Sequence, residues 1–411
     1  MKTLISMALA ATLLTPALLA AEPLRLLPAA QGDLVATRLS QEKSAPSGDI
    51  ERAPVDFAWA LDPVAALARE APFVADSREF WTLLDAAQLK RGHAFHTTAP
   101  GALVRLSPAA GAKNAGLRID DIALRIDGKR LDAARAVSAS VDAAQLKAAG
   151  ADFSEGTLVF RLAPEAGIGK VELAADNASG SYLLHVFEPD SPVSLRLNAD
   201  SDRALAGGSV KLSAQMTSDA KQLRPQRIGG LVTSPDGHSI EVDFTRTKRG
   251  DYEAVLELPA DAGSGLALWE VHTFAVAKRG EALVPRDAKT SFSVSRPTAR
   301  LGDEADAGIA KSGAVAIALP VEVASPGRYE VRGVLYGSST DGSLQPFAIA
   351  HSARWLEPGH ARIALDFGDL AAKSGLAAPY ELRDVSLNDQ ARLGLLETRA
   401  RALRIEASAT R

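Results

Sequence analysis

The sequence predicts a mostly β protein made of three β-sandwich domains, with immunoglobulin-like features and few short helices. Apolar and polar residues alternate with a period of two in many short segments, as in strands that bury one face. The 32 glycines and 22 prolines are spread along the 411 residues, as expected for many turns between short strands. The chain has no cysteine, so each domain must be large enough to hold its own hydrophobic core without disulfides.

Residues 1–21 predict a cleaved signal peptide. Lys2 supplies a positive charge, Leu4 to Leu19 form an almost unbroken apolar run, and Ala20-Ala21 are small residues suited to cleavage. A membrane anchor is the alternative, but Pro16 interrupts the run and no basic flank follows it. No later segment is apolar enough to span a membrane. We therefore expect a periplasmic or secreted protein, with no cysteine at the cleavage site to carry a lipid.

The charge of the chain is moderate. Its 46 lysines and arginines and 50 aspartates and glutamates give a formal net charge of −4, which becomes −5 when Lys2 is removed with the leader. There is no basic excess to attract nucleic acid or anionic lipid. The sequence therefore predicts no nucleic-acid partner.

A flexible segment is expected over residues 22–54, because this stretch is polar, lacks apolar periodicity and contains many turn-forming residues. A first, mostly β domain is then expected over residues 55–190. It contains a hairpin turn at Asp127-Gly128 and a helix over 141–149, capped by Ser140. Its strands are expected at 103–106, 157–162, 170–175 and 182–187, with two short strands within 117–131 that are broken at Asp120-Asp121.

Residues 107–129 are similar to the middle of a PDZ domain, but no carboxylate-binding glycine loop precedes them. A PDZ domain binds peptide ends by adding them as a strand to an open sheet edge. A plain β meander that turns at Asp127-Gly128 explains the same residues.

An immunoglobulin-like sandwich is predicted over residues 191–297. Alternating apolar residues mark a strand over 210–216, and Ser234-Pro-Asp-Gly237 predicts a turn. Tyr252 and Trp269 are expected in its core. A second sandwich is predicted over residues 298–411, with alternation at 315–319 and 329–335 and one helical turn at 368–375.

Several segments together resemble an uncharacterised family of exported proteins of Gram-negative bacteria, which carry a domain of unknown function built from immunoglobulin-like sandwiches. These segments are 327–331, 353–359, 378–384 and 182–197, together with the domain of Tyr252 and Trp269. The resemblance implies a multidomain β architecture and onward secretion. It brings no catalytic residues.

No catalytic motif is complete. Ser40 and Lys43 have the S-x-x-K spacing of penicillin-recognising enzymes but lack the partner motifs of that class. Gly337-Ser-Ser339-Thr-Asp-Gly342 approaches the G-x-S-x-G elbow of serine hydrolases, yet its last glycine is displaced and the segment is typical of a loop. We therefore assign no catalytic residue.

Metal ligands are also sparse. His93 and His96 lie three residues apart, which on a strand places them on opposite faces. His351 and His360 could meet across a hairpin, although a polar loop edge explains them more simply. We expect no cofactor, and the only ion we consider is calcium at a domain boundary. Its oxygen ligands would come from Asn198, Asp200 and Asp202, or from Asp303, Glu304 and Asp306.

Three tryptophans, Trp59, Trp81 and Trp355, could act as sugar-stacking platforms if they are exposed. We therefore expect a non-enzymatic exported protein that binds a protein or polysaccharide partner or acts as a spacer. The alternatives are a secreted hydrolase with an unrecognised active site and a periplasmic peptide-binding or assembly factor. The sequence does not favour any one oligomeric state.

Overall fold

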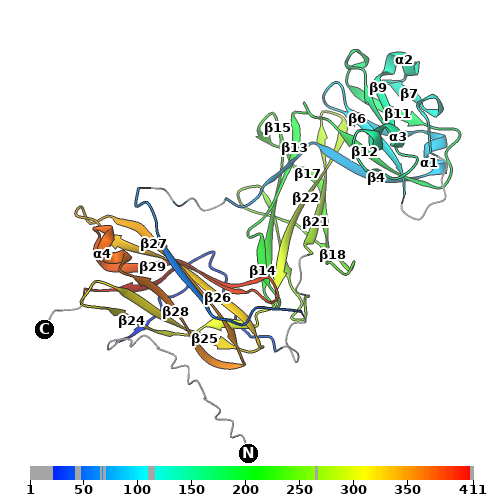
Figure 1. Ribbon diagram of the computed structural model, residues 1–411. Helices are drawn as coiled ribbons and strands as arrows, with labels where there is room; N and C mark the ends of the chain where they lie inside the picture. The colour runs from blue at the N-terminus through cyan, green and yellow to red at the C-terminus, as the bar shows by residue number, and fades with distance from the viewer. Residues whose placement is uncertain are drawn as a thin grey trace, which may run out of the picture. The chain divides into compact units, whose positions relative to one another are not determined.

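The computed structural model describes residues 22–41, 48–64, 67, 71–109, 116–263 and 267–407. Strands dominate these residues, and the few helices are short, which confirms the predicted mostly β, multidomain fold. The chain divides into two compact units (Figure 1). The first unit combines residues 1–69 with residues 295–411, and the second contains residues 70–294. No helix among the described residues has the length and apolar character needed to cross a membrane.

Two five-stranded sheets face each other in the first unit and enclose one core. Alternating apolar residues supply that core from both sides, for example Ile317 and Ile363 from one sheet and Val331 and Leu382 from the other. The first sheet contains β1 (Glu22–Arg25), β24 (Glu304–Ile309), β25 (Val315–Val323), β23 (Ala299–Leu301) and β28 (Gly359–Gly368). The second has the order β2 (Val55–Ala60), β27 (Leu344–Leu356), β26 (Gly327–Ser338), β29 (Ala377–Asp389) and β30 (Gly394–Ile405). Helix α4 (Leu370–Ser374) lies at the predicted helical turn.

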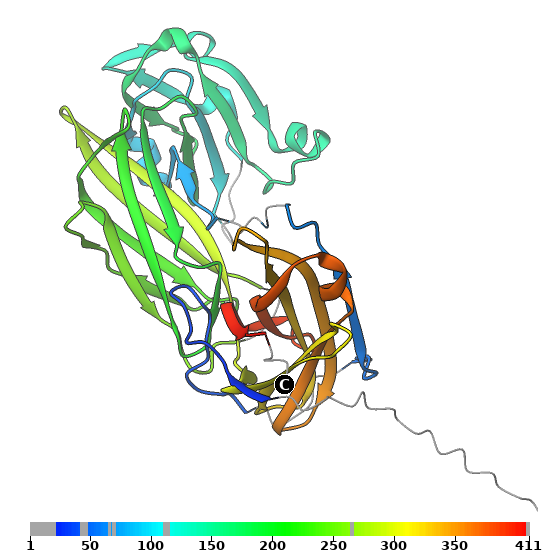
Figure 2. The ribbon, with the colours of Figure 1, turned by 90° about the vertical axis from the view of Figure 1, so that its left-hand side faces the viewer.

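The N-terminal part of the chain belongs to this first unit, which corrects two expectations. Residues 22–54 are not simply a flexible segment, because β1 pairs with β24 and the Leu27 N–H donates to the carbonyl of Ala402. Val55–Ala60 do not begin an N-terminal domain, because β2 pairs with β27, as the blue and orange strands of Figure 1 show. Figure 2 gives a second view of these strands. Polar composition predicted flexibility here, but the backbone of a short strand can pair whatever its side chains are.

The first lobe of the second unit encloses a core that runs from Phe80 to Val186. One of its sheets has the order β5 (His93–Thr97), β11 (Gly169–Ala174), β7 (Ala123–Ile126) and β8 (Lys129–Leu131). The facing strands are β4 (Glu79–Asp85), β12 (Ser181–Phe187), β6 (Leu103–Pro108), β10 (Leu158–Leu162) and β9 (Val137–Asp142). Its α-helices are α1 (Ala86–Arg91), α2 (Ala133–Ala136) and α3 (Ala143–Ala148), and two single 3₁₀ turns occupy Ile119–Asp121 and Pro164–Ala166.

Two local predictions in this lobe can be compared with the structure. The hairpin turn is confirmed, since Asp127 and Gly128 both adopt the positive φ that a tight turn between β7 and β8 requires. The helix predicted from residue 141 begins later, because β9 continues to Asp142. Asp142 rather than Ser140 caps α3, and its side chain accepts from the Gln145 N–H.

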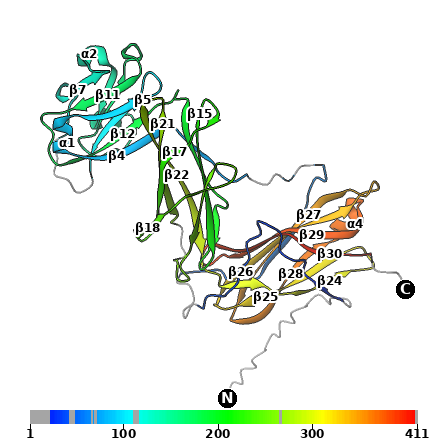
Figure 3. The same ribbon diagram turned by 180° about the vertical axis from the view of Figure 1, so that it is seen from behind.

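The second lobe of this unit encloses a core that runs from Val193 to Val294. One sheet contains β19 (Thr245–Arg246), β20 (Tyr252–Glu257), β15 (Ser209–Ser218), β13 (Val193–Ala199), β3 (Ala75–Ser77) and β16 (Lys221–Gln222). The facing strands are β18 (Ser239–Val242), β17 (Pro225–Thr233), β21 (Trp269–Arg279), β22 (Ala282–Ser295) and β14 (Arg203–Leu205). Figure 3 shows β17, β21 and β22 side by side. Trp269 and Tyr252 are both buried in this core, which confirms their structural role.

The two lobes of the second unit share a sheet. Strand β22 of the second lobe pairs with β4 of the first at one position, Asp287 opposite Glu79, so that ten strands form one continuous sheet. A single pair of residues gives a narrow connection. Other contacts must therefore hold the lobes together, and the polar cluster described below supplies them.

Burial of Tyr329 makes the stability of the first unit depend on pH in the alkaline range. It is fully buried, its hydroxyl donates to the Ser325 carbonyl at 2.7 Å, and burial raises the pKa of Tyr329 to about 12 from its ordinary 10.0. Ionisation is then easier in the unfolded chain, so stability falls as the pH rises from about 10 towards 12. We expect Tyr329→Phe to lose about 1 kcal/mol at neutral pH and to show a weaker alkaline decline. Chemical unfolding of both proteins between neutral and alkaline pH checks this, and equal alkaline slopes would contradict it.

Candidate functional site

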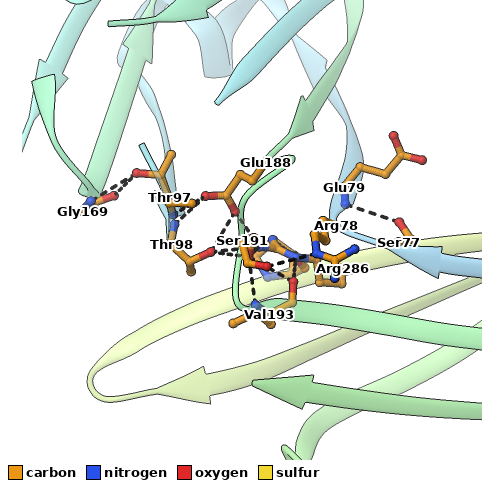
Figure 4. Close-up of polar contacts among 12 residues, drawn as sticks. Ser77, Arg78, Glu79, Thr97, Thr98, Gly169, Glu188, Ser191, Val193 and Arg286 are labelled. Atoms are coloured by element: carbon orange, nitrogen blue, oxygen red, sulfur yellow. Dashed lines mark hydrogen bonds and ion pairs between the residues drawn. The ribbon is translucent and has the colours of Figure 1, made fainter. Parts of the chain in front are cut away.

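A buried polar cluster connects the two lobes of the second unit (Figure 4). Arg286 on β22 contacts Glu188, which follows β12, with Nη2 2.5 Å from Oε2. The same guanidinium donates to the Val193 carbonyl and to the hydroxyls of Thr98 and Ser191. Glu188 also accepts from the backbone N–H groups of Thr98 and Ala99. Segments from both lobes therefore meet at one ion pair.

The polar cluster is closed to solvent. The side chains of Arg286 and Glu188 are both 0% exposed, so no substrate can reach them. Burial lowers the pKa of the Arg286 guanidinium, and the Glu188 carboxylate opposes that shift. A charged pair that is enclosed and fully hydrogen-bonded is a structural element of the junction, and we assign it no chemistry.

The histidines singled out in the sequence do not come together. His93 and His96 lie on β5 opposite Leu173 and Lys170 of β11, and burial lowers the pKa of His93. His351 and His360 fall in different sheets, on β27 and β28. Over the part of the chain that the structure describes, no three His, Asp or Glu side chains form a group able to hold a metal ion.

The oxygen ligands considered for calcium are engaged with other groups. Asp200 accepts from the Lys211 N–H, and Asp306 lies 2.9 Å from the Arg362 guanidinium. Asp303 and Glu304 line a shallow hollow together with Arg362 and Arg25, whose charges oppose a bound cation. Among the described residues these side chains form no group of three metal ligands, and calcium at a domain boundary stays a prediction.

The serine motif at residues 337–342 does not form a nucleophilic site. Ser339 and Asp341 lie in the exposed loop between β26 and β27, where hydrogen bonds from Ser339 and Ser343 lower the pKa of Asp341 to about 2. This carboxylate stabilises its own loop. The S-x-x-K pair cannot be assessed, because Lys43 lies outside the described residues.

Among the described residues of the PDZ-like segment, strands β6 and β7 lie inside their sheets, and only Lys129 belongs to an edge strand, β8. Strand β6 pairs with β12 and β10, and β7 pairs with β11 and β8, so both strands are internal. Peptide addition requires unpaired backbone groups at a sheet edge. The arrangement of these two strands therefore does not favour peptide binding along them.

The three tryptophans proposed as platforms differ in how their rings are covered. The Trp81 ring stacks on His185 and meets His272 edge-on, and the Lys289 ammonium lies 5.2 Å from its centre. Arg52 covers the Trp355 ring at 4.0 Å. Trp59, in contrast, is 45% exposed. Only Trp59 among the three presents a large exposed surface.

Trp59 is part of an aromatic stack on the outer face of the second sheet of the first unit. Strand β2 alternates, so that Ala58 packs on the core while Phe57 and Trp59 point outward. Strand pairing places Phe57 opposite His351 of β27. The three ring centres lie 4.9 to 5.3 Å apart, with ring planes within 15° of parallel. Phe57, Trp59 and His351, here called the aromatic stack, thus form one group of nearly parallel, stacked rings.

Hydrogen bonds hold the His351 ring in this orientation. Its Nδ1 lies 2.6 Å from Oε1 of Glu330 on the neighbouring strand β26. Glu330 in turn accepts from the side chain of Gln390, whose oxygen accepts from Arg328. The aromatic stack is therefore bordered by fixed polar groups that can also exchange hydrogen bonds with a ligand.

Two family models match the chain. The N-terminal domain of a family described as a domain of unknown function, DUF4785, matches residues 46–188, and the C-terminal domain of the same family matches residues 298–406. Together they cover more than half of the sequence. The chain belongs to the DUF4785 family. This confirms the resemblance to an uncharacterised family that the sequence indicates.

A DUF4785 family protein from Legionella pneumophila has a similar fold in its crystal structure. The two chains share 20% sequence identity with a TM-score of 0.69, and the match covers 92% of this chain and 99% of that one. Native Escherichia coli alpha-2-macroglobulin gives a partial match, with 13% identity, a TM-score of 0.30 and coverage of 75% of this chain and 20% of that one. The TM-score of this second match is too low to indicate a shared fold. No functionally curated protein matches the sequence.

The sequence of this DUF4785 chain indicated Trp59 but not its two partners. Phe57 precedes Trp59 by two residues on a strand, and this spacing places both rings on one face. That signal was available in residues 57–59. His351 lies almost 300 residues away, and only the pairing of β2 with β27 brings it to the stack.

Proposed function

We propose that this chain is an exported polysaccharide-binding protein and that the aromatic stack is its sugar platform. The observation that carries the proposal is the parallel, partly exposed arrangement of Phe57, Trp59 and His351. A pyranose ring has an apolar face of C–H groups and a rim of hydroxyls. An exposed aromatic ring can pack on the apolar face, and polar groups beside it can bond to the hydroxyls.

Exposure of the side chains supports this reading over a structural one. Phe57 and Trp59 are 47% and 45% exposed, and Val55 beside them on β2 is 40% exposed. A contiguous exposed apolar patch with a polar border is typical of a binding site. Export is a proposal that rests on the leader at residues 1–21 and is tested by locating the protein in fractionated cells.

We expect Trp59→Ala to weaken polysaccharide binding about tenfold, or about 1.4 kcal/mol. Loss of the largest ring removes most of the stacking surface and leaves the sheet intact. Binding is measured by affinity electrophoresis and calorimetry against a panel of soluble neutral and acidic polysaccharides. The matched control is Trp355→Ala, whose ring Arg52 already covers, and it should bind like the unaltered protein.

Two results would count against the proposal. One is that the unaltered protein binds no member of the panel. The other is that Trp59→Ala and Trp355→Ala bind equally well, which would place any binding away from the aromatic stack.

A further inference from the structure

A row of residues on the outer face leads from the aromatic stack across the sheet, and Val334 in its middle is only 5% exposed. Strand register places Trp59 opposite Ile349, Ile349 opposite Val334, Val334 opposite Arg383, and Arg383 opposite Arg401. Their sequence neighbours Ala348, Leu335, Leu382 and Ala402 belong to the core, so the row lies on the other face. Four strand spacings of about 4.8 Å make this row about 19 Å long.

At the far end of the row, exposed guanidiniums lie above a buried carboxylate. Arg383 and Arg401 approach the buried carboxylate of Glu381 to 2.6 and 2.8 Å, and Arg404 lies 3.7 Å from it. Arg404 also pairs with Glu406. The side chains of Arg401 and Arg404 are 52% and 47% exposed, whereas that of Glu381 is 2% exposed, so the guanidiniums reach the surface above this carboxylate. Although burial opposes it, hydrogen bonds from Arg401 and Arg383 lower the pKa of Glu381, which therefore remains ionised.

Arg332 adds a second positive charge midway along the sheet. It lies on β26 opposite His351 of the aromatic stack, and its side chain is exposed. The nearby Glu330 carboxylate is bonded to His351 and to the Gln390 side chain. In the residues that the structure describes, no carboxylate forms an ion pair with Arg332. Its guanidinium is available to a ligand that lies on the aromatic stack.

We infer that the polysaccharide is anionic, with carboxylates on its sugar rings, and that it lies across the strands from Trp59 towards Arg401. This inference rests on the proposed function and names the class of its ligand. One sugar stacks on the aromatic stack while carboxylates further along the polymer meet the guanidiniums of Arg332 and Arg401. A guanidinium can donate two parallel hydrogen bonds to a carboxylate, and the length of the row calls for a polymer.

The test compares polygalacturonate with its methyl ester, which has the same backbone without the charge. The full-length mature protein is used, with Arg332→Gln and Arg401→Gln as variants. Arg332→Gln is the cleaner variant, because it leaves no protein carboxylate without a partner. Arg130→Gln, on exposed strand β8 of the other unit, is the matched control. Thermal unfolding of each variant identifies any change in stability.

We expect polygalacturonate to bind more tightly than its ester, and its affinity to fall as salt is added. Each sheet variant should weaken polygalacturonate binding three- to tenfold and leave ester binding unchanged, while Arg130→Gln alters neither. Equal, Trp59-dependent binding of polygalacturonate and ester, insensitive to Arg332→Gln, would overturn the anionic ligand and leave polysaccharide binding in place. Absence of binding to these two polymers and to every neutral polysaccharide would overturn the proposed function itself.

Discussion

Replacing Arg286 with methionine should destabilise the second unit by about 3–5 kcal/mol, because it leaves the Glu188 carboxylate buried without its counter-charge. Glu188 is 0% exposed and would keep only the N–H groups of Thr98 and Ala99 and the Thr98 hydroxyl as donors. The Val193 carbonyl and the Ser191 hydroxyl would each lose a donor as well. A loss of this size is a large part of the stability of an ordinary domain.

The matched control for Arg286→Met is Arg300→Met in the first unit. Arg300 also forms an ion pair, with Glu322 at 2.8 Å, but both side chains are more than one-third exposed. Solvent screens such a pair, so its loss should cost about 0–1 kcal/mol. Calorimetry gives the overall loss, and hydrogen exchange in β13 and β22 shows whether the junction opens. A loss for Arg286→Met no larger than that of the control would contradict a role for the ion pair in holding the lobes together.

Replacing both Arg286 and Glu188 distinguishes two contributions to stability. One is the destabilisation caused by an unpaired buried charge, and the other is the stabilisation that the intact ion pair provides. Arg286→Met with Glu188→Met should recover part of the stability that Arg286→Met loses, because no buried charge then lacks a partner. Recovery should be incomplete, since Thr98 and Ala99 would lose the acceptor of their N–H groups. The comparison therefore measures how much of the stability of the junction comes from the ion pair and how much comes from hydrogen bonds.

Local sequence pattern predicts strands well where one face is buried. The alternation of Val210, Leu212, Ala214 and Met216 corresponds to β15, in which every one of these side chains is buried. The same rule identified much of β25 and β26. It says nothing about which strand pairs with which. Strand β2 alternates clearly, yet its partner β27 lies almost 300 residues further along, and nothing in residues 55–60 names that partner.

The candidate site shows the same limit. An exposed tryptophan could be proposed from residue type alone, but three tryptophans were equivalent in the sequence. What separates them is the covering of Trp355 by Arg52 and of Trp81 by His185, and both contacts depend on the fold. The row from Trp59 to Arg401 depends on the register of four strand pairs. Period-two pattern fixes which face a side chain takes, whereas pairing and bulges fix its neighbours.

Trp269→Ala should destabilise the second unit by about 3–5 kcal/mol, whereas Trp59→Ala should cost the first unit about 1 kcal/mol or less. The substitution is the same, and burial separates the two positions. Trp269 is 3% exposed and packs against Phe292 in the core, so its removal leaves a cavity. Trp59 touches Phe57 and His351 on the surface, where water fills the space that the ring leaves.

Chemical unfolding of the two variants, compared with the unaltered protein, decides what a binding result means. If Trp59→Ala remains folded with nearly unchanged stability, its loss of polysaccharide affinity belongs to the ring itself. If it loses as much stability as Trp269→Ala, the aromatic stack supports the sheet as well as facing solvent. Its exposure would then no longer argue for a ligand. The arginines on the same face of the sheet would have to be tested separately, through Arg332→Gln.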